Sequence, residues 1–170
     1  MLLFSLEVKH ARAAAAARVL RGAAREQLSA LGLDGRELSL SLVSDRRIRA
    51  LNRLHRGKDR PTDVLSFPQQ EARAAMRAQG PIGDVVISLQ TAIRQAGEGG
   101  WPLAAELRRL LAHGLLHCLG HDHQTAREAK KMDAAERRLL GAEGMVGAGW
   151  PQLRAIPPRK SLRPQSLLHK

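Results

Sequence analysis

Four of the chain's seven histidines lie within the eleven residues from 113 to 123. His113 and His117 are four residues apart, so on a helix their rings project from neighbouring turns of one face and can share a metal ion. Gly120 permits the left-handed backbone that ends a helix and turns His123 back toward that face. Three imidazoles leave one position of a tetrahedral zinc ion open to water, which such an ion makes nucleophilic at neutral pH. The segment therefore predicts a catalytic site in which His113, His117 and His123 hold one divalent ion, zinc or another metal that suits imidazole, such as nickel or copper.

The spacing of these residues, HxxxHxxGxxH, also matches the zinc motif of metzincin proteases. Those enzymes need a glutamate directly after the first histidine as the general base. This chain has Gly114 at that position, which has no side chain to accept a proton. Met132 falls in an expected helix, where the proteases have a methionine-bearing turn. A metallopeptidase is therefore kept only as an alternative.

Three further side chains near the histidines each have two interpretations. Asp122 either accepts a hydrogen bond from a ligand imidazole or is a solvated loop acid. His121 is a fourth ligand or a proton shuttle in one interpretation, and an exposed loop histidine in the other, which we favour. Glu106 lies two turns before His113, where it could orient a ligand or assist water, or could pair with Arg109 three residues later.

A second cluster of charge, residues 56–63, has the sequence RGKDRPTD. Its glycine and proline restrict the backbone, and the planar guanidinium of Arg56 could clamp a phosphate. The alternative is a charged loop that is simply solvated.

The hydrophobic pattern around both clusters predicts alternating strands and helices. The helix over residues 102–119 carries one apolar stripe, with His113 and His117 at its edge. Residues 52–62 are expected to form an exposed loop and residues 69–80 an insertion. The remaining elements are strands over 2–8, 38–43, 64–67 and 84–88, and helices over 11–31, after Ser44 and Asp45, over 89–96 and over 125–140.

A chain of 170 residues is long enough for one domain with a real core. With 28 Lys and Arg against 16 Asp and Glu, its formal net charge of +12 favours polyanionic partners such as nucleic acid. Only 2% of the residues are aromatic, so RNA binding would depend on phosphate contacts and not on base stacking. We expect a folded domain over residues 1–146 and a basic, flexible segment over residues 147–170.

The single cysteine, Cys118, cannot form an internal disulfide, which fits a reducing compartment. The apolar start is too short for a signal peptide, and no apolar run is long enough to span a membrane. The expectation is a soluble, cytoplasmic protein.

Three stretches of the chain resemble the bacterial YbeY family of endoribonucleases, also called rRNA maturation factors. They are Leu51-Asn52 with residues 56–68, the segment GDVVIS over residues 83–88, and the histidine segment. Together with the order of expected elements, the resemblance covers most of residues 2–145. Two departures are His55 and His121, which stand where the family often has tyrosine. A third is the basic segment after Val146, which extends past the usual end.

The resemblance implies a zincin-like α+β single domain, with a small mixed sheet packed with about five helices. It implies that His113, His117 and His123 are the metal ligands and that Arg56 is the arginine needed for activity on RNA. The implied function is metal-dependent, single-strand-specific endoribonuclease activity in rRNA processing and ribosome quality control, notably at the 3′ end of the small-subunit rRNA. Candidate partners are rRNA on the small ribosomal subunit, a ribosomal protein and an assembly GTPase, and no DNA is expected. Two points stay open. The first is the alternative that the chain is a ribosome-assembly factor with weak catalysis. The second is the proton acceptor, which could be Glu106, His121 or the 2′-hydroxyl of the RNA.

Overall fold

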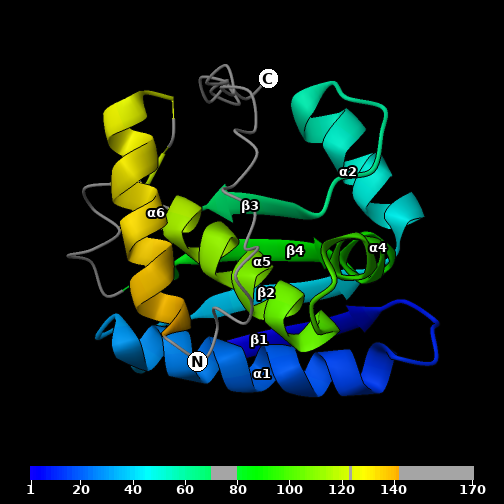
Figure 1. Ribbon diagram of the computed structural model, residues 1–170, viewed down its shortest axis with the longest axis horizontal. Coiled ribbons are helices and arrows are strands. Elements are labelled where there is room, and N and C mark those ends of the chain that lie inside the picture. Colours follow the sequence, from blue (N-terminus) through cyan, green and yellow to red (C-terminus); the bar gives the residue numbers. More distant parts are fainter. Residues whose placement is uncertain (70–79, 123, 142–170) are drawn as a thin grey trace, which may run out of the picture.

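The computed structural model describes residues 1–69, 80–122 and 124–141. Strands and helices alternate along much of the chain (Figure 1). In chain order they are β1 (Leu2–Glu7), α1 (Ala13–Ala30), β2 (Leu38–Val43), α2 (Asp45–Arg56), β3 (Val64–Pro68), β4 (Gly83–Ser88), α4 (Leu89–Gly99), α5 (Leu103–Cys118) and α6 (Ala126–Leu140).

The four strands form one mixed sheet in the order β1-β2-β4-β3. β2 pairs in parallel with β1 and with β4, so Leu40 lies between Phe4 and Val85. β3 runs antiparallel to β4, with Leu65 opposite Val86, and forms one edge of the sheet. This sheet and the five helices of the described residues confirm the expected α+β class.

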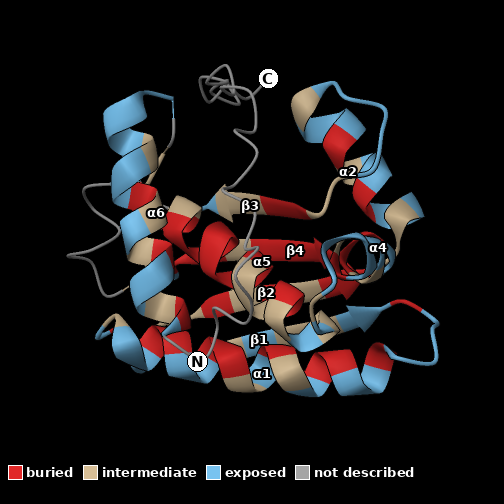
Figure 2. Cartoon of the chain, viewed as in Figure 1, coloured by how far each residue is buried: buried red, intermediate tan, exposed pale blue. Residues whose placement is uncertain are grey.

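The main core lies between the sheet and the helices α1 and α5 (Figure 2). In β2 the three leucines are fully buried, whereas the serines between them are only half-buried, because successive side chains of a strand point to opposite faces. α5 supplies further core leucines to the same cluster, so the histidine helix is anchored along its length. A smaller cluster beneath α2 contains Val43, Ile48, Leu65 and Val86.

The predicted end of the histidine helix is confirmed. α5 ends at Cys118, and Gly120 follows with a φ of 86°, a conformation that side chains with a Cβ rarely adopt. The turn is closed by the backbone N–H of His121, which donates to the carbonyl of Leu116 at 3.0 Å. The chain therefore reverses directly after the two helical histidines.

Two expected boundaries were wrong. The loop predicted from Asn52 begins only after Arg56, because α2 continues until Gly57, whose φ of 66° ends it. The helix predicted to break at Gly97 continues to Gly99 and is capped by Gly100, with a φ of 72°. Residues 70–79 of the predicted insertion and the predicted basic segment over 147–170 lie outside the described residues. Within the described ranges, no helix has the length and apolar character needed to cross a membrane.

Candidate metal centre

α5 brings His113 and His117 together as their spacing predicts. Their Nε2 atoms are 3.2 Å apart, and their ring planes are inclined by 80° with centroids 4.6 Å apart. His113 is buried, with 4% of its surface exposed, while His117 is half-buried. The two Nε2 atoms therefore meet at the boundary between the core and the surface.

The separation of the two Nε2 atoms fits a shared metal ion. Zinc binds imidazole nitrogen at about 2.0–2.1 Å, so two ligands at the tetrahedral angle stand about 3.3 Å apart. The observed 3.2 Å is close to that value. The two histidines could thus hold a zinc ion without a large movement of either ring.

The other nitrogen of His113 contacts a residue that the sequence analysis missed. Nδ1 lies 2.7 Å from Oε1 of Glu136 on α6, and 4% of Glu136 is exposed. Because carboxylate oxygens accept hydrogen bonds, this contact suits a His113 ring that has its hydrogen on Nδ1 and a lone pair on Nε2. The sequence did contain a signal for Glu136: it lies four residues from both Met132 and Leu140, so a helix places this acid in the middle of an apolar stripe.

The third predicted ligand, His123, lies outside the described residues. Over residues 1–69, 80–122 and 124–141, no group of three or more His, Cys, Asp or Glu side chains is placed to hold a metal ion. The three-histidine site therefore stays a prediction, supported by the geometry of His113 and His117.

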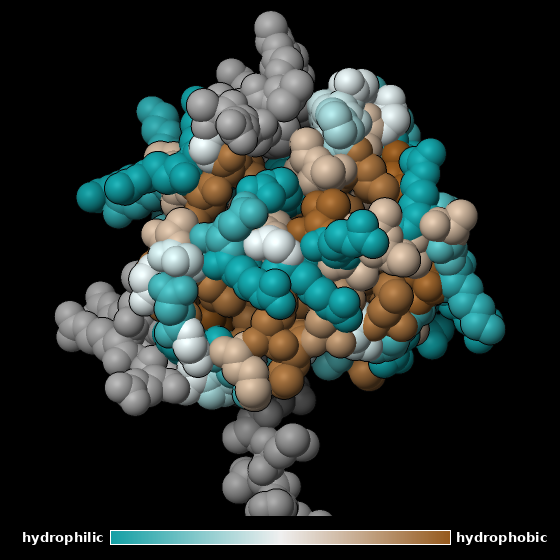
Figure 3. Space-filling view, turned by 90° about the horizontal axis from the view of Figure 1, so that it is seen from below, coloured by the Kyte–Doolittle hydropathy of each residue, from teal (hydrophilic) through white to brown (hydrophobic). Residues whose placement is uncertain are grey.

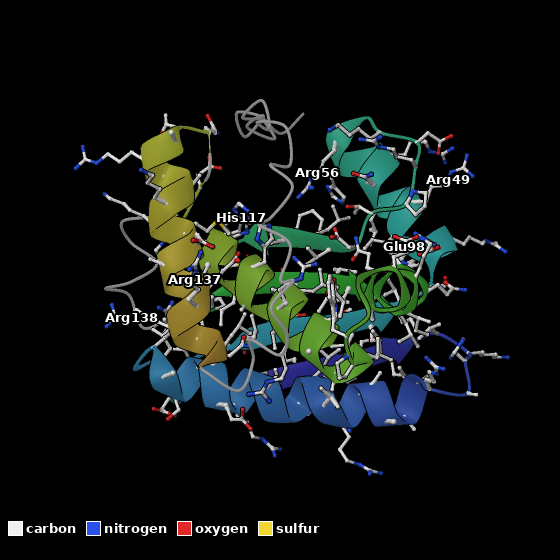
Figure 4. All side chains as sticks on the ribbon, viewed as in Figure 1. Arg49, Arg56, Glu98, His117, Arg137 and Arg138 are labelled. Carbon is white, nitrogen blue, oxygen red and sulfur yellow. The ribbon has the colours of Figure 1, made fainter. Side chains whose placement is uncertain are left out.

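Arg56 is the last residue of α2 and is half-buried. Figure 4 shows its side chain extending from the end of α2 toward β3, the strand near which His117 also lies. The neighbouring His55 packs edge-on against Phe67 of β3, with ring centroids 4.9 Å apart. The amide of Asn52, a buried residue of α2, donates to the carbonyl of Arg60 at 2.7 Å and holds the following loop. These contacts fix the end of α2 over the same edge of the sheet.

Glu106 is fully buried and is engaged by two donors. Its Oε2 accepts from Nε1 of Trp101 at 2.8 Å and from Nε of Arg109 at 3.2 Å, and Arg109 also bonds Oε1. Burial by itself lowers the pKa of Arg109, but the hydrogen bonds and charge of Glu106, with the charges of Asp63 and Glu136, outweigh it and raise the pKa. Glu106 is thus placed as an ion-pair partner, the second of its two interpretations.

The loop after α5 carries His121 and Asp122, both half-buried. Burial lowers the pKa of His121, and the positive charge of Lys131 lowers it further. Asp122 accepts a hydrogen bond from the side chain of Gln124 at 2.6 Å. His121 is therefore less exposed than we expected for a loop histidine.

Comparison with known proteins identifies the family. The family model described as Endoribonuclease YbeY matches residues 5–143. An Endoribonuclease YbeY from Myxococcus xanthus is 54% identical over 142 residues, which cover 84% of this chain and 48% of that protein. Another from an Anaeromyxobacter species is 53% identical, with 84% of this chain and 73% of that protein covered. The chain thus spans about half of the first relative and nearly three quarters of the second.

A solved structure shares the fold. The solution structure of TM1509 from Thermotoga maritima superposes with a TM-score of 0.55 at 24% sequence identity, covering 83% of this chain and 90% of that one. The family match over residues 5–143 includes Arg56, the paired histidines and the whole sheet except the first three residues of β1. The chain belongs to the YbeY endoribonuclease family.

Proposed function

We propose that this chain is a metal-dependent endoribonuclease that cleaves single-stranded RNA during the processing of ribosomal RNA. The observation that carries the metal-dependent part is the pair of Nε2 atoms 3.2 Å apart, one of them on a ring whose Nδ1 is bound by Glu136. His113, His117 and His123 would hold the ion, with zinc as the first candidate and nickel or another divalent ion as the alternative.

The chain's own residues have separate roles in this proposal. The buried ring of His113 and the half-buried ring of His117 would both bind the ion through Nε2, since these two atoms already lie 3.2 Å apart. Arg56, held beside β3, binds a phosphate oxygen through its planar guanidinium and stabilises the charge that grows on the phosphate during cleavage. A divalent ion bound at the histidines would polarise the phosphate and activate water.

The contacts of Glu106 argue against it as the proton acceptor. Both oxygens of Glu106 are engaged, by Trp101 and Arg109, in a fully buried position. That leaves His121 and the 2′-hydroxyl of the RNA from the three candidates of the sequence.

A peptidase is not supported by the surroundings of Gly114. A Cβ built on Gly114 would lie 2.8 Å from Cγ1 of Val85 and 3.2 Å from Cγ2 of Val64. A glutamate at this position would therefore be directed at the sheet and not at the histidines.

The family and the net charge support a more specific proposal for the substrate, the compartment and the partners. We propose rRNA of the small ribosomal subunit, near its 3′ end, as the substrate, and the cytoplasm as the compartment. A ribosomal protein or an assembly GTPase would bring the chain to that site. A net charge of +12 supports a ribonucleoprotein substrate, because Lys and Arg bind phosphates.

The proposal is tested with metal-replete protein, a labelled single-stranded rRNA fragment and two variants, His117→Ala and Arg56→Glu. Each should slow cleavage by about 100-fold or more, because Arg56 stabilises charge on the phosphate and His117 would hold the ion that polarises it. Metal content is measured in parallel by mass spectrometry, and only His117→Ala should lose the ion.

Two matched variants control for charge and for histidine loss. Arg46→Glu makes the same charge change at an exposed position near the other end of α2, and His10→Ala removes an exposed histidine before α1. Both should cleave at close to the unaltered rate. Full cleavage by His117→Ala and Arg56→Glu would exclude the assigned site. Slow cleavage by the unaltered, metal-replete protein would instead favour the alternative of an assembly factor with weak catalysis.

A further inference from the structure

One carboxylate from outside α5 reaches the histidine pair. Glu136 lies on α6, 23 residues after His113, and its Oε1 is 2.7 Å from Nδ1 of that ring. Both side chains are almost fully buried, with 6% of His113 and 5% of Glu136 exposed. Water therefore has little access to replace either partner.

We propose that Glu136 is a positioning residue, which holds His113 in the tautomer with hydrogen on Nδ1 and so directs the lone pair of Nε2 at the point shared with His117. This inference rests on the proposed metal-dependent function. A neutral imidazole has one N–H, and a carboxylate fixes where that hydrogen resides, which sets both the ring orientation and its basicity toward a metal.

α6 is well suited to hold Glu136 in place. Met132 and Leu140, one turn to either side, are also buried, so Glu136 lies on the face of α6 that packs against the rest of the molecule. The start of the helix is fixed by a capping box, in which Thr125 and Glu128 exchange side-chain to backbone hydrogen bonds. Figure 1 shows α6 lying beside the end of α5 that carries the histidines.

A buried cation connects this carboxylate to the rest of the site. The side chain of Arg109, one turn before His113 on α5, is 13% exposed and bonds Glu106. Asp63 and Glu136 both add to the charge that stabilises its cationic form. Asp63 closes the loop that begins after Arg56, so Arg109 lies among carboxylates from α5, α6 and the Arg56 loop. The positive charge of Arg109 thus offsets part of the cost of burying the Glu136 carboxylate.

The test compares Glu136→Gln with the unaltered protein by two measurements. Zinc affinity, from competition with a chelator, should fall by about 10–100-fold in the variant, as it does when other carboxylates bound to ligand histidines are removed. ¹⁵N NMR of the metal-free proteins should show His113 with hydrogen on Nδ1 in the unaltered chain. In the variant that single tautomer should be lost, because an amide both donates and accepts.

Asp133→Asn is the matched control. It neutralises a carboxylate three residues earlier on α6, whose side chain is 44% exposed and pairs with Arg137. Zinc affinity and the His113 tautomer should both stay unchanged.

The outcomes separate this inference from the proposed function. Unaltered zinc affinity and an unaltered His113 spectrum in a folded Glu136→Gln protein would overturn the role of Glu136 and leave the nuclease proposal standing. If the variant does not fold, the unaltered protein still decides, since hydrogen on Nε2 of its metal-free His113 would overturn the inference. If the unaltered protein binds no zinc but keeps the Nδ1 tautomer, the positioning by Glu136 holds and the metal-dependent function fails.

Discussion

Two buried glutamates lie near the histidine pair in different ways. Glu106 is close to it along the sequence, and Glu136 is close to it in space. Glu106 precedes His113 on α5 and bonds Trp101 and Arg109, whereas Glu136 comes from another helix and bonds His113 itself. Proximity along one helix therefore did not identify the carboxylate that contacts the ligand. Burial does not distinguish the two either, because both are buried and each carboxylate bonds the donors within its reach.

Cys118 ends α5 directly after His117 and is inaccessible, with 0% of its surface exposed. Burial, reinforced by the charge of Asp84, raises the pKa of its thiol to about 12. Since the thiolate is the reactive form, the thiol should not react with a disulfide reagent at about pH 8 in the folded protein, and should react fully in denaturant. Reaction of the folded protein at the rate of a free thiol would show that the C-terminal end of α5 opens readily.

The same pKa has a consequence for stability. The unfolded thiol ionises near its ordinary value of 9.0 and the folded one only near 12, so the folded state binds the proton more tightly. The free energy of unfolding should therefore fall as the pH rises between these two values. Urea titrations across this range should show a shallower fall for Cys118→Ala than for the unaltered protein.

At the scale of elements, the site depends on how closely α5 approaches the sheet. Gly114 faces β3 and β4 at the turn between the two histidines, and a Cβ there would meet Val85 and Val64 at 2.8 and 3.2 Å. The helix can lie this close only because residue 114 has no side chain. The position that metzincins use for a general base is used here for packing.

Gly114→Ala should accordingly destabilise the protein despite the better helix propensity of alanine. Alanine contributes about 1 kcal/mol in a helix interior, whereas overpacking a core costs about 1–3 kcal/mol, so a net loss of about 1 kcal/mol is expected in urea unfolding. Gly22→Ala on α1, where an added Cβ meets nothing within 4 Å, should instead stabilise by about 0.5–1 kcal/mol.

A double-mutant cycle identifies the cause. Val85→Ala alone should be destabilising, but in the Gly114→Ala background it should cost less, because the Cβ of the introduced alanine no longer competes for space with the two Cγ methyl groups of Val85. Additive effects of the two substitutions would show that the loss in Gly114→Ala arises elsewhere.

The sequence predicted the elements better than the contacts between them. The i, i+4 spacing of His113 and His117 and the glycine at 120 are local signals, and both were confirmed. The continuation of α2 to Arg56 was missed because residues 52–62 are dense in charge, glycine and proline, which is typical of a loop, although the first turn of this range is helical and Asn52 is buried there with its amide bonded to the carbonyl of Arg60. Glu136 could not be paired with His113 from spacing, because their contact depends on how α6 packs against α5.

At the scale of the whole molecule, positive charge extends well beyond the site. Arg18, Arg21 and Arg25 are exposed along α1, and Figure 3, which looks onto that side, shows hydrophilic side chains across it between hydrophobic patches. Arg21 also lies over the ring of Phe4, 4.5 Å from its centroid. RNA binding should therefore combine a specific site near β3 with a diffuse electrostatic attraction, and only the second should depend steeply on salt.

The basic segment after Met145 allows the two contributions to be separated. It contains Arg154, Arg159, Lys160, Arg163 and Lys170 and no acidic residue, so a chain ending at Met145 keeps a net charge of 12 − 5 = +7. Because the family match ends at residue 143, this shortened chain should unfold at the same temperature as the full one. Its affinity for single-stranded RNA should fall at low salt, and the slope of log K against log salt should decrease by up to about 0.7 for each lost phosphate contact.

Replacing the five basic residues by glutamine in the full-length chain should reproduce the shallower slope, because the effect arises from charge and not from length. In both altered proteins the cleavage rate at saturating RNA should stay unchanged, since Arg56 and the histidines are retained. A lower unfolding temperature in the shortened chain would instead place residues after 145 within the folded domain, and the boundary predicted at residue 146 would then be wrong.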